Sequence, residues 1–395
     1  MAHQVTRRVA LKKTLCGLAI GLPALTGKQL LSASSSLSDE IAPPERGAMA
    51  ALAESFRQRF DAPGLSVAIA RNGHLVYEQA FGVTGHDSSE QLTAADLFRI
   101  ASVSKPITSV AVFTLVEKGR LQTQDTVFGS QGILGTDYGK HTYGEGIEQI
   151  TIDHLLTHTS GGWDNGPGDP MFSNPQMNQA ELISWTLDNQ PLKNPPGRVF
   201  AYSNFGYCVL GRVIEKVTGQ AYSDYVQQAV LLPCGITDMR IAGNSLEARA
   251  PEEVTYYGQY RTGREGHYED PYAINVTRMD SHGGWISTAT DLVRFAVHVD
   301  GFAANRNILK GETLRRMSMP SDVNPHYARG WRVNEKGHWW HGGDLPGTSA
   351  ILVRTSSRFC WAALTNTRRE SSPRALDDLI WDMAHKVSAW RAALS

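Results

Sequence analysis

Cysteine is scarce in this chain, and neither sign of charge predominates. The 395 residues include four cysteines, one inside the N-terminal segment discussed below and three that are widely spaced (Cys208, Cys234 and Cys360). That spacing excludes a disulfide framework or a cysteine metal site, so we expect the three to be buried small apolar residues. The 38 Lys and Arg against 39 Asp and Glu give a net charge of -1. This balance excludes charge-driven binding to nucleic acid or to anionic lipid.

Long hydrophobic runs are also absent. The uncharged run at residues 14–27 is too short to span a bilayer, so no stable membrane span is expected. Arg7 and Arg8 precede this run and small residues follow it, the order typical of an export signal. The paired arginines resemble a bacterial twin-arginine signal. We therefore expect residues 1–33 to direct export, to the periplasm of a bacterium, and residues 34–46 to be a linker. An amphipathic N-terminal helix is the alternative.

Strand patterns occur near both ends of the remaining chain, with helical patterns between them. Asn72 and Gly73 separate two apolar runs, which is a strong hairpin signal. Strands are predicted at residues 65–69, 75–81, 339–341, 349–355 and 359–365. Helices are predicted at residues 47–60, 102–118, 152–157, 180–187, 204–217, 223–231, 290–299 and 375–394. We expect residues 47–109 and 321–395 to form an α/β domain, with a mostly helical domain, residues 110–320, inserted into it.

The most informative motif is a Ser-x-x-Lys formed by Ser102 and Lys105 at the start of a predicted helix. Side chains three residues apart lie on one face of a helix, one turn from each other. A lysine there can take the proton from the serine hydroxyl when burial or neighbouring groups suppress its charge. The motif is short enough to arise by chance on a helix surface. Lys105 lies between two apolar runs, however, where an unpaired charge is costly, and this favours a catalytic pair.

A second motif is the Tyr-x-Asn of Tyr202 and Asn204. A tyrosine beside a lysine can pass protons to a leaving group, and an asparagine amide can bind both a lysine and a substrate carbonyl. Taken alone, the pair is equally consistent with a turn aromatic and a helix cap.

A third motif, His341-Gly342-Gly343-Asp344, follows a predicted strand. Two glycines allow close backbone approach, and a strand edge beside a nucleophile can form an oxyanion hole. A β-bulge or turn is the alternative interpretation of the two glycines. His341 would line such a site as a polar, usually neutral group.

The three motifs in this order resemble the serine β-lactamase and penicillin-binding-protein-type hydrolases, in the branch with class C β-lactamases, D-alanyl carboxypeptidases and esterases. Segments 154–161, 206–219 and 283–292 match as well, and the resemblance runs from about residue 48 to the end. It implies an α+β fold of the β-lactamase/transpeptidase type. In that fold an antiparallel sheet is flanked by helices, a helical domain is inserted, and the active site lies at the interface.

The resemblance also implies roles for individual residues. Ser102 would be acylated, while Lys105 and Tyr202 would share the general-base and general-acid work, with the acylation base left open. Asn204 would position the lysine and the substrate. The backbone N–H groups of Ser102 and Asp344 would hold the oxyanion, with Gly343 completing the third motif. No metal or organic cofactor is implied.

One departure bears on the substrate. The third motif begins with His341, where typical β-lactamases have a lysine whose charge helps to hold a substrate carboxylate. We therefore expect a serine hydrolase acting on an ester or a D-amino-acid peptide or amide, ahead of a β-lactam. A non-enzymatic sensor that becomes acylated without turnover is the alternative on the same fold.

The loop at residues 161–178 is a candidate wall of the substrate pocket. Its apolar residues Trp163, Met171 and Phe172 would contact an acyl chain or a ring, or would instead pack beneath the loop. His154 and His158 are four residues apart, but no glutamate lies between them, so a zinc peptidase is not expected.

Overall fold

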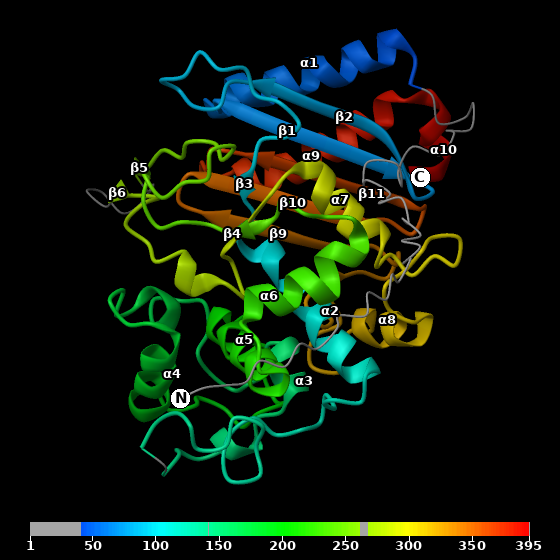
Figure 1. Ribbon diagram of the computed structural model, residues 1–395. Helices are drawn as coiled ribbons and strands as arrows, with labels where there is room; N and C mark the ends of the chain where they lie inside the picture. The colour runs from blue at the N-terminus through cyan, green and yellow to red at the C-terminus, as the bar shows by residue number, and fades with distance from the viewer. Residues whose placement is uncertain (1–40, 141, 261–267, 395) are drawn as a thin grey trace, which may run out of the picture.

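A computed structural model describes residues 41–140, 142–260 and 268–394. The predicted export signal, residues 1–33, lies outside these ranges. The chain forms an antiparallel sheet covered by helices on both faces, with a helical region beneath one end of the sheet (Figure 1). None of the helices in the described ranges is both long and apolar enough to cross a bilayer.

The main sheet has six strands in the order β2-β1-β11-β10-β9-β8. The two ends of the chain meet in it, because β1 pairs with β11 in antiparallel register. The hairpin between β1 and β2 turns at Asn72 and Gly73, whose φ angles are 51° and 84°. These positive values are what a two-residue hairpin turn requires, so the hairpin prediction is confirmed. The strands are β1 (Gly64–Arg71), β2 (His74–Gly82), β8 (Arg332–Val333), β9 (Trp339–Leu345), β10 (Thr348–Arg354) and β11 (Phe359–Thr365).

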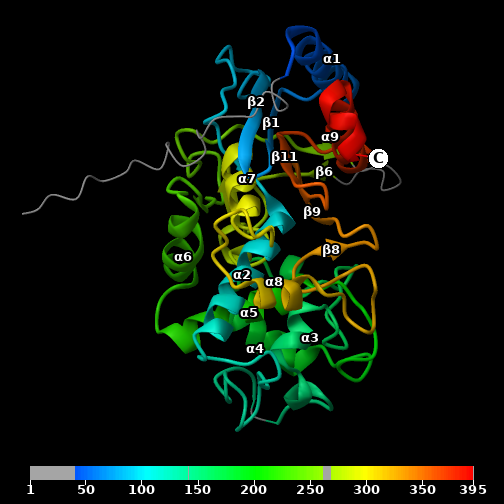
Figure 2. The same cartoon turned by 90° about the vertical axis from the view of Figure 1, so that its right-hand side faces the viewer.

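Both faces of the central strands β1, β10 and β11 are buried, which explains the continuous apolar runs in them. In β1, Val67 and Ile69 face the core formed with α1 (Pro43–Phe60) and α9 (Ser372–Lys386). Ala68 and Ala70 face the opposite core, where α7 (Ala289–Val297) packs. Figure 2 shows α1 and α9 on one side of the sheet and α7 on the other.

The helical region surrounds α2 (Ser104–Glu117), whose residues from Ser104 to Leu115 are all buried. This helix packs against α5 (Asn204–Thr218), which in turn contacts α3 (Ile152–Leu156) and α4 (Gln179–Asn189). Short strands complete the structure: β3 (Phe98–Arg99), β7 (Trp285–Ser287) and β4 (Arg240–Ile241) form one sheet, and β5 (Gln259–Tyr260) pairs with β6 (Tyr268–Glu269). The smaller helices are α6 (Tyr222–Val226), α8 (Gly311–Ser318) and α10 (Arg391–Leu394).

The antiparallel sheet with flanking helices confirms the predicted fold class. The prediction was wrong at three boundaries. Residues 43–46, expected in the linker, begin α1, because Pro43 is favourable in a first helical turn and Glu45 caps it. The predicted boundary at residue 320 places α7 in the helical domain, whereas its apolar face packs on the sheet. The strand predicted at residues 339–341 was too short, since β9 continues through Gly342 and Gly343 to Leu345, and the alternative of a turn at these glycines does not hold.

Candidate active site

Ser102 lies in a 3-10 turn, η3 (Ala101–Val103), that leads directly into α2. The preceding residue, Ala101, has a φ of 46°, a left-handed conformation that is costly for a residue with a side chain. This strained turn lies against β9, the strand that carries the third motif. A Cβ atom added to Gly343 would lie 2.1 Å from the Ile100 carbonyl oxygen and 3.0 Å from the Ser102 nitrogen. Only a glycine allows the strand to approach the nucleophile this closely.

Lys105 is fully buried, and its Nζ atom contacts three oxygens. The Ser102 Oγ lies at 2.9 Å, the Asn204 Oδ1 at 2.8 Å and the His282 carbonyl oxygen at 3.1 Å. Burial lowers the pKa of this ammonium well below its usual value, and the negative charge of Asp169 partly offsets the effect. A neutral amine has two N–H bonds and one lone pair. Because the two carbonyl oxygens can only accept, they take both N–H bonds, and the lone pair is left facing the serine hydroxyl.

Asp169 fixes the orientation of the Asn204 amide. The Asn204 Nδ2 donates to Asp169 Oδ2 at 2.7 Å and to Asn165 Oδ1 at 3.1 Å, so its Oδ1 is turned toward Lys105. Asp169 is buried and caps the turn η5 (Pro170–Phe172) by accepting from the Met171 N–H. The sequence offered only a cap signal for Asp169, an acidic residue before a proline, and none for Asn165.

Tyr202 is packed against the lysine, with Lys105 Nζ 4.7 Å from the centre of its ring. Burial raises the pKa of the Tyr202 phenol, and a side-chain hydrogen bond with Ser102 acts in the opposite direction. The phenol is therefore protonated at neutral pH and can act as a proton donor. All three predicted catalytic side chains, those of Ser102, Lys105 and Tyr202, meet at one point.

Two histidines behind Tyr202 are joined through Tyr327. The Tyr327 hydroxyl lies 3.0 Å from His158 Nε2 and 3.2 Å from His341 Nε2. The other ring nitrogens settle the tautomers: the Ser203 N–H donates to His158 Nδ1, while His341 Nδ1 lies 2.7 Å from the Gly342 carbonyl, which can only accept. Burial lowers the pKa of both imidazoles well below its usual range.

These constraints give the hydrogen bonds one direction. His158 donates through Nε2 to Tyr327, Tyr327 donates to His341 Nε2, and His341 donates through Nδ1 to Gly342. His341 is thus neutral, and both of its ring nitrogens are used within the protein. The sequence indicated His341 but gave no signal for Tyr327, and it singled out His158 only by its spacing from His154.

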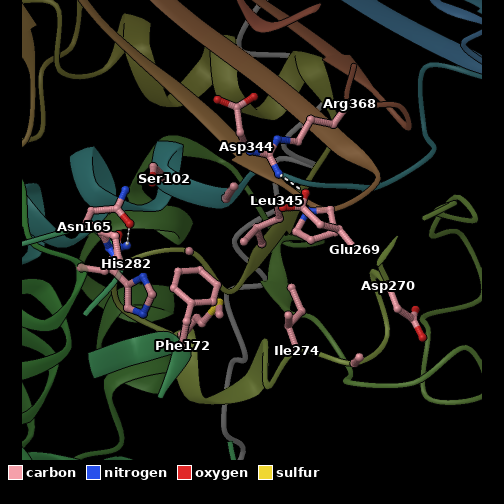
Figure 3. A pocket seen from close by; sticks show the side chains of 18 of the residues that line it. Ser102, Asn165, Phe172, Glu269, Asp270, Ile274, His282, Asp344, Leu345 and Arg368 are labelled. Carbon is pink, nitrogen blue, oxygen red and sulfur yellow. Dashed lines mark hydrogen bonds and ion pairs between the residues drawn. The ribbon is translucent and has the colours of Figure 1, made fainter. Parts of the chain in front are cut away.

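Two hollows open on Ser102. The smaller has a volume of about 560 Å³ and is lined by Tyr202, His341 and the exposed Arg332 of β8. The larger has a volume of about 720 Å³, and Asn204 and Phe172 are among the residues that line it. Figure 3 shows the larger hollow extending from Ser102 and Asn165 past Phe172 and Leu345 toward Glu269 and Asp270. Asp344 and Arg368 border both hollows.

Of the three predicted wall residues, only Phe172 lines a hollow. Trp163 and Met171 are buried in the core instead, so a place in the pocket wall is wrong for both and the alternative, packing beneath the loop, holds. The Trp163 indole packs on Phe205 and donates to the Gln190 carbonyl. Both side chains hold the loop in place from beneath. The remaining cysteines, Cys208, Cys234 and Cys360, are free and buried, as predicted.

The sequence of this chain matches a protein family and several known proteins. A family model described as Beta-lactamase matches residues 49–385. Penicillin-binding protein 4* of Bacillus subtilis (strain 168) is 28% identical over 314 residues, covering 73% of this chain and 64% of the relative. Protein flp of Staphylococcus aureus (strain MRSA252) is 25% identical over 330 residues, covering 82% of this chain and 63% of the relative. The chain therefore spans less than two thirds of the length of these relatives.

Solved structures share the fold. The D-amino acid amidase from Ochrobactrum anthropi SV3, complexed with L-phenylalanine amide, matches with a TM-score of 0.70 at 19% identity, over 89% of this chain and 100% of the amidase. EstCE1, described as a hydrolase with promiscuous acyltransferase activity, matches with a TM-score of 0.68 at 20% identity, over 87% of this chain and 100% of EstCE1.

Proposed function

The chain belongs to the beta-lactamase family, and from that premise we propose that it is a serine hydrolase that cleaves an ester or amide bond through an acyl-enzyme on Ser102. The observation that carries this proposal is the buried contact of 2.9 Å between Lys105 Nζ and Ser102 Oγ. A deprotonated lysine amine at that distance can activate the hydroxyl without a histidine.

Acylation assigns different roles to Lys105 and Tyr202. The Ser102 proton passes to the Lys105 lone pair as Oγ bonds to the substrate carbonyl carbon. The Tyr202 phenol gives its proton to the leaving oxygen or nitrogen as the old bond breaks, and the proton on Lys105 restores the phenol. The lowered pKa of Lys105 and the raised pKa of Tyr202 support this division. Water then attacks the acyl group, releases the acid and regenerates Ser102.

The close approach of β9 to η3 supports an oxyanion site between them. We assign the oxyanion to the backbone N–H groups of Ser102 and Asp344, with Gly343 at the point of contact. Preorganised donors of this kind contribute about 3–4 kcal/mol each to transition-state stabilisation.

Arg332 favours a D-peptide over a simple ester as the substrate. His341 offers no positive charge, but the Arg332 guanidinium borders the same hollow as Tyr202, which must contact the leaving group. A leaving group that ends in a carboxylate, such as a terminal D-amino acid, would meet this cation. The esterase assignment is the second candidate, because the same acyl-enzyme chemistry on Ser102 cleaves an ester. A β-lactam ranks third because His341 replaces the usual lysine.

The decisive experiment compares a short p-nitrophenyl ester with an acyl-D-alanyl-D-alanine peptide. We expect turnover by the wild-type chain and a loss of several orders of magnitude, about 10⁴-fold or more, in Ser102→Ala, as when a nucleophile is removed elsewhere. Peptide turnover would favour the D-peptidase, and ester turnover alone the esterase. A wild-type chain that gains acyl mass without turnover would favour the acylated sensor. Retention of activity in Ser102→Ala would contradict the nucleophile assignment.

We also propose that the chain is exported, on the basis of its paired arginines and the short apolar run that follows them. Fractionation of a bacterial host expressing the full chain, with and without Arg7→Lys and Arg8→Lys, tests this. We expect a periplasmic product that is lost when both arginines are replaced.

A further inference from the structure

We propose that the larger hollow beside Ser102 is a binding site for a bulky, apolar, uncharged acyl group, with Phe172 as its specificity-determining residue. This inference rests on the proposed function, since it concerns the substrate of the same serine. It names the part of the substrate that remains on the enzyme after the leaving group departs.

The position of Tyr202 assigns the two hollows to the two halves of the substrate. The proton donor must touch the leaving atom, and Tyr202 borders the smaller hollow but not the larger one. The leaving group therefore occupies the smaller hollow, next to Arg332. The acyl half then occupies the larger hollow, which Figure 3 shows.

Part of the wall of this hollow is apolar. It includes Phe172, Ile274, Met279, Leu345 and Pro346. Phe172 is unusual among them, because half of its surface, 50%, is exposed although its neighbour Met171 is buried in the core. An apolar ring left open beside a nucleophile provides a surface that gains free energy when a ligand covers it.

The turn that carries Phe172 is held rigidly. The Arg278 guanidinium is buried beneath it and donates to the carbonyl oxygens of Met171, Ser173, Asn174 and Met177 at 2.8–3.3 Å. Asp169 caps the same turn from the catalytic side. The ring is thus presented in a fixed position, so little conformational entropy is lost when an acyl group packs on it.

Charge excludes an anionic acyl group. The far part of the hollow contains the Arg368–Glu269 ion pair, with a distance of 2.8 Å, and the carboxylates of Asp270 and Asp344 also border it. Among the residues that the structure describes, three carboxylates and one guanidinium border this hollow, an excess of negative charge. A volume of about 720 Å³ accommodates a group as large as an arylacetyl or a medium-length alkanoyl chain.

The test compares kcat/KM for p-nitrophenyl phenylacetate and p-nitrophenyl acetate, which share a leaving group. We expect the wild-type chain to prefer phenylacetate by about tenfold or more, and Phe172→Ala to lower that ratio by about tenfold. Phe172→Leu should give an intermediate ratio. Leu232→Ala is the matched control, because Leu232 is also 50% exposed and does not border the hollow, so the ratio should remain at the wild-type value.

A second comparison requires no variant. The p-nitrophenyl ester of hexanoic acid and the mono-p-nitrophenyl ester of adipic acid present acyl chains of equal length, one of which ends in a carboxylate. We expect the neutral chain to react at least about tenfold faster at low ionic strength.

The outcomes separate the inference from the function on which it rests. Ser102-dependent turnover with no preference for phenylacetate, or a ratio unchanged in Phe172→Ala, would overturn the acyl site and leave the hydrolase intact. Equal rates for the two six-carbon chains would overturn the charge exclusion. Failure of every ester and peptide to react in a Ser102-dependent way would overturn the proposed function itself.

Discussion

At the scale of single residues, the site depends on which atoms face Lys105. Its two carbonyl partners are acceptors only, and one of them belongs to an amide that could be turned the other way round. Asp169 prevents that rotation, because its carboxylate can accept from the Asn204 Nδ2 but cannot donate to Oδ1. A buried carboxylate that never touches the substrate thereby controls the direction of the lysine lone pair.

Replacing Asp169 with asparagine should therefore change both rate and pH dependence. The new side chain can donate to the Asn204 Oδ1, so the amide loses its fixed orientation and kcat/KM should fall by about tenfold to a hundredfold. The negative charge of Asp169 raises the pKa of Lys105. Removing that charge lowers this pKa, and since the neutral amine is the active form, the acidic limb of the pH–rate profile should move to lower pH.

The matched control for this change is Asp137→Asn, which removes an exposed carboxylate paired with Lys216 on the surface. Its pH–rate profile should superimpose on that of the wild type. An acidic limb that stays in place in Asp169→Asn, or moves to higher pH, would contradict the electrostatic role of Asp169.

Sequence reasoning succeeded at this scale for residues within short motifs and failed for residues that are close only in space. Ser102 and Lys105 are three positions apart, and helix geometry alone brings them together. Tyr327 and Arg332 have no spacing relative to the other motifs that a sequence pattern could reveal. Trp163 and Met171 were misplaced because an apolar residue in a loop can face either the pocket or the core beneath it.

At the scale of secondary structure elements, the site is the contact between β9 and the turn that begins α2. Gly343 lies at the closest point, while Gly342 has room for a side chain, since a Cβ atom added there would be in ordinary van der Waals contact, 3.8 Å from its nearest neighbour. Of these two adjacent glycines, position 342 therefore has space for a Cβ atom and position 343 does not. The strand itself was predicted, but its continuation through both glycines was not, because glycine is rare within strands.

Gly343→Ala should therefore inactivate the enzyme, whereas Gly342→Ala should not. The added methyl group at position 343 forces β9 away from η3 and opens the oxyanion site, with an expected loss of about 10²–10³-fold in kcat. Parallel kinetics of the two variants provide the measurement, and a folded state confirmed by circular dichroism is required for both. Equal activity of the two variants would show that β9 does not form the oxyanion site.

Tyr327 couples three further segments, since it joins His158 after α3 to His341 on β9. Tyr327→Phe leaves two buried ring nitrogens without partners, which should lower the free energy of unfolding by about 1–3 kcal/mol for each. The ¹⁵N chemical shifts of the histidine side chains should show His341 protonated at Nδ1 in both proteins, because the Gly342 carbonyl fixes that tautomer, whereas the His341 Nε2 signal should shift in the variant because its hydrogen bond from Tyr327 is lost. Tyr225→Phe, which removes a buried hydroxyl paired with Thr114, should leave these signals unchanged. A wild-type spectrum with His341 protonated at Nε2 would contradict the proposed hydrogen-bond direction.

At the scale of the whole molecule, the site depends on the relative position of the sheet and the helical region. Gly343 belongs to the sheet and Lys105 to the helical region, so the site is lost if the two move apart. The alternation of strand side chains between two cores made the sheet predictable from sequence. The position of α7 was not predictable, because an apolar helix face does not reveal whether its partner is a sheet or another helix. The polar contacts between the two parts are likewise invisible in the sequence.

Arg329 makes one of these contacts, just before β8. Its guanidinium donates to both carboxylate oxygens of Asp153 on α3, at 2.6 and 3.0 Å, and to the carbonyl oxygens of Arg316 and Met319. The pair is largely buried, and breaking a buried pair leaves one charge without compensation, at a cost of about 3–5 kcal/mol. Arg329→Ala should therefore lower the urea midpoint, whereas Arg315→Ala, on the exposed side of α8, should leave it unchanged.

Because this ion pair links the two parts, its loss should also separate their unfolding. In the wild type, tryptophan fluorescence and far-ultraviolet circular dichroism should follow one coincident transition, the behaviour of a cooperative unit. In Arg329→Ala, activity should be lost at a lower urea concentration than either spectroscopic signal, since separation of β9 from α2 destroys the site before the cores unfold. If activity and both spectroscopic signals were lost together in the variant, the apolar contacts between the sheet and the helical region, rather than Arg329, would hold these two parts together.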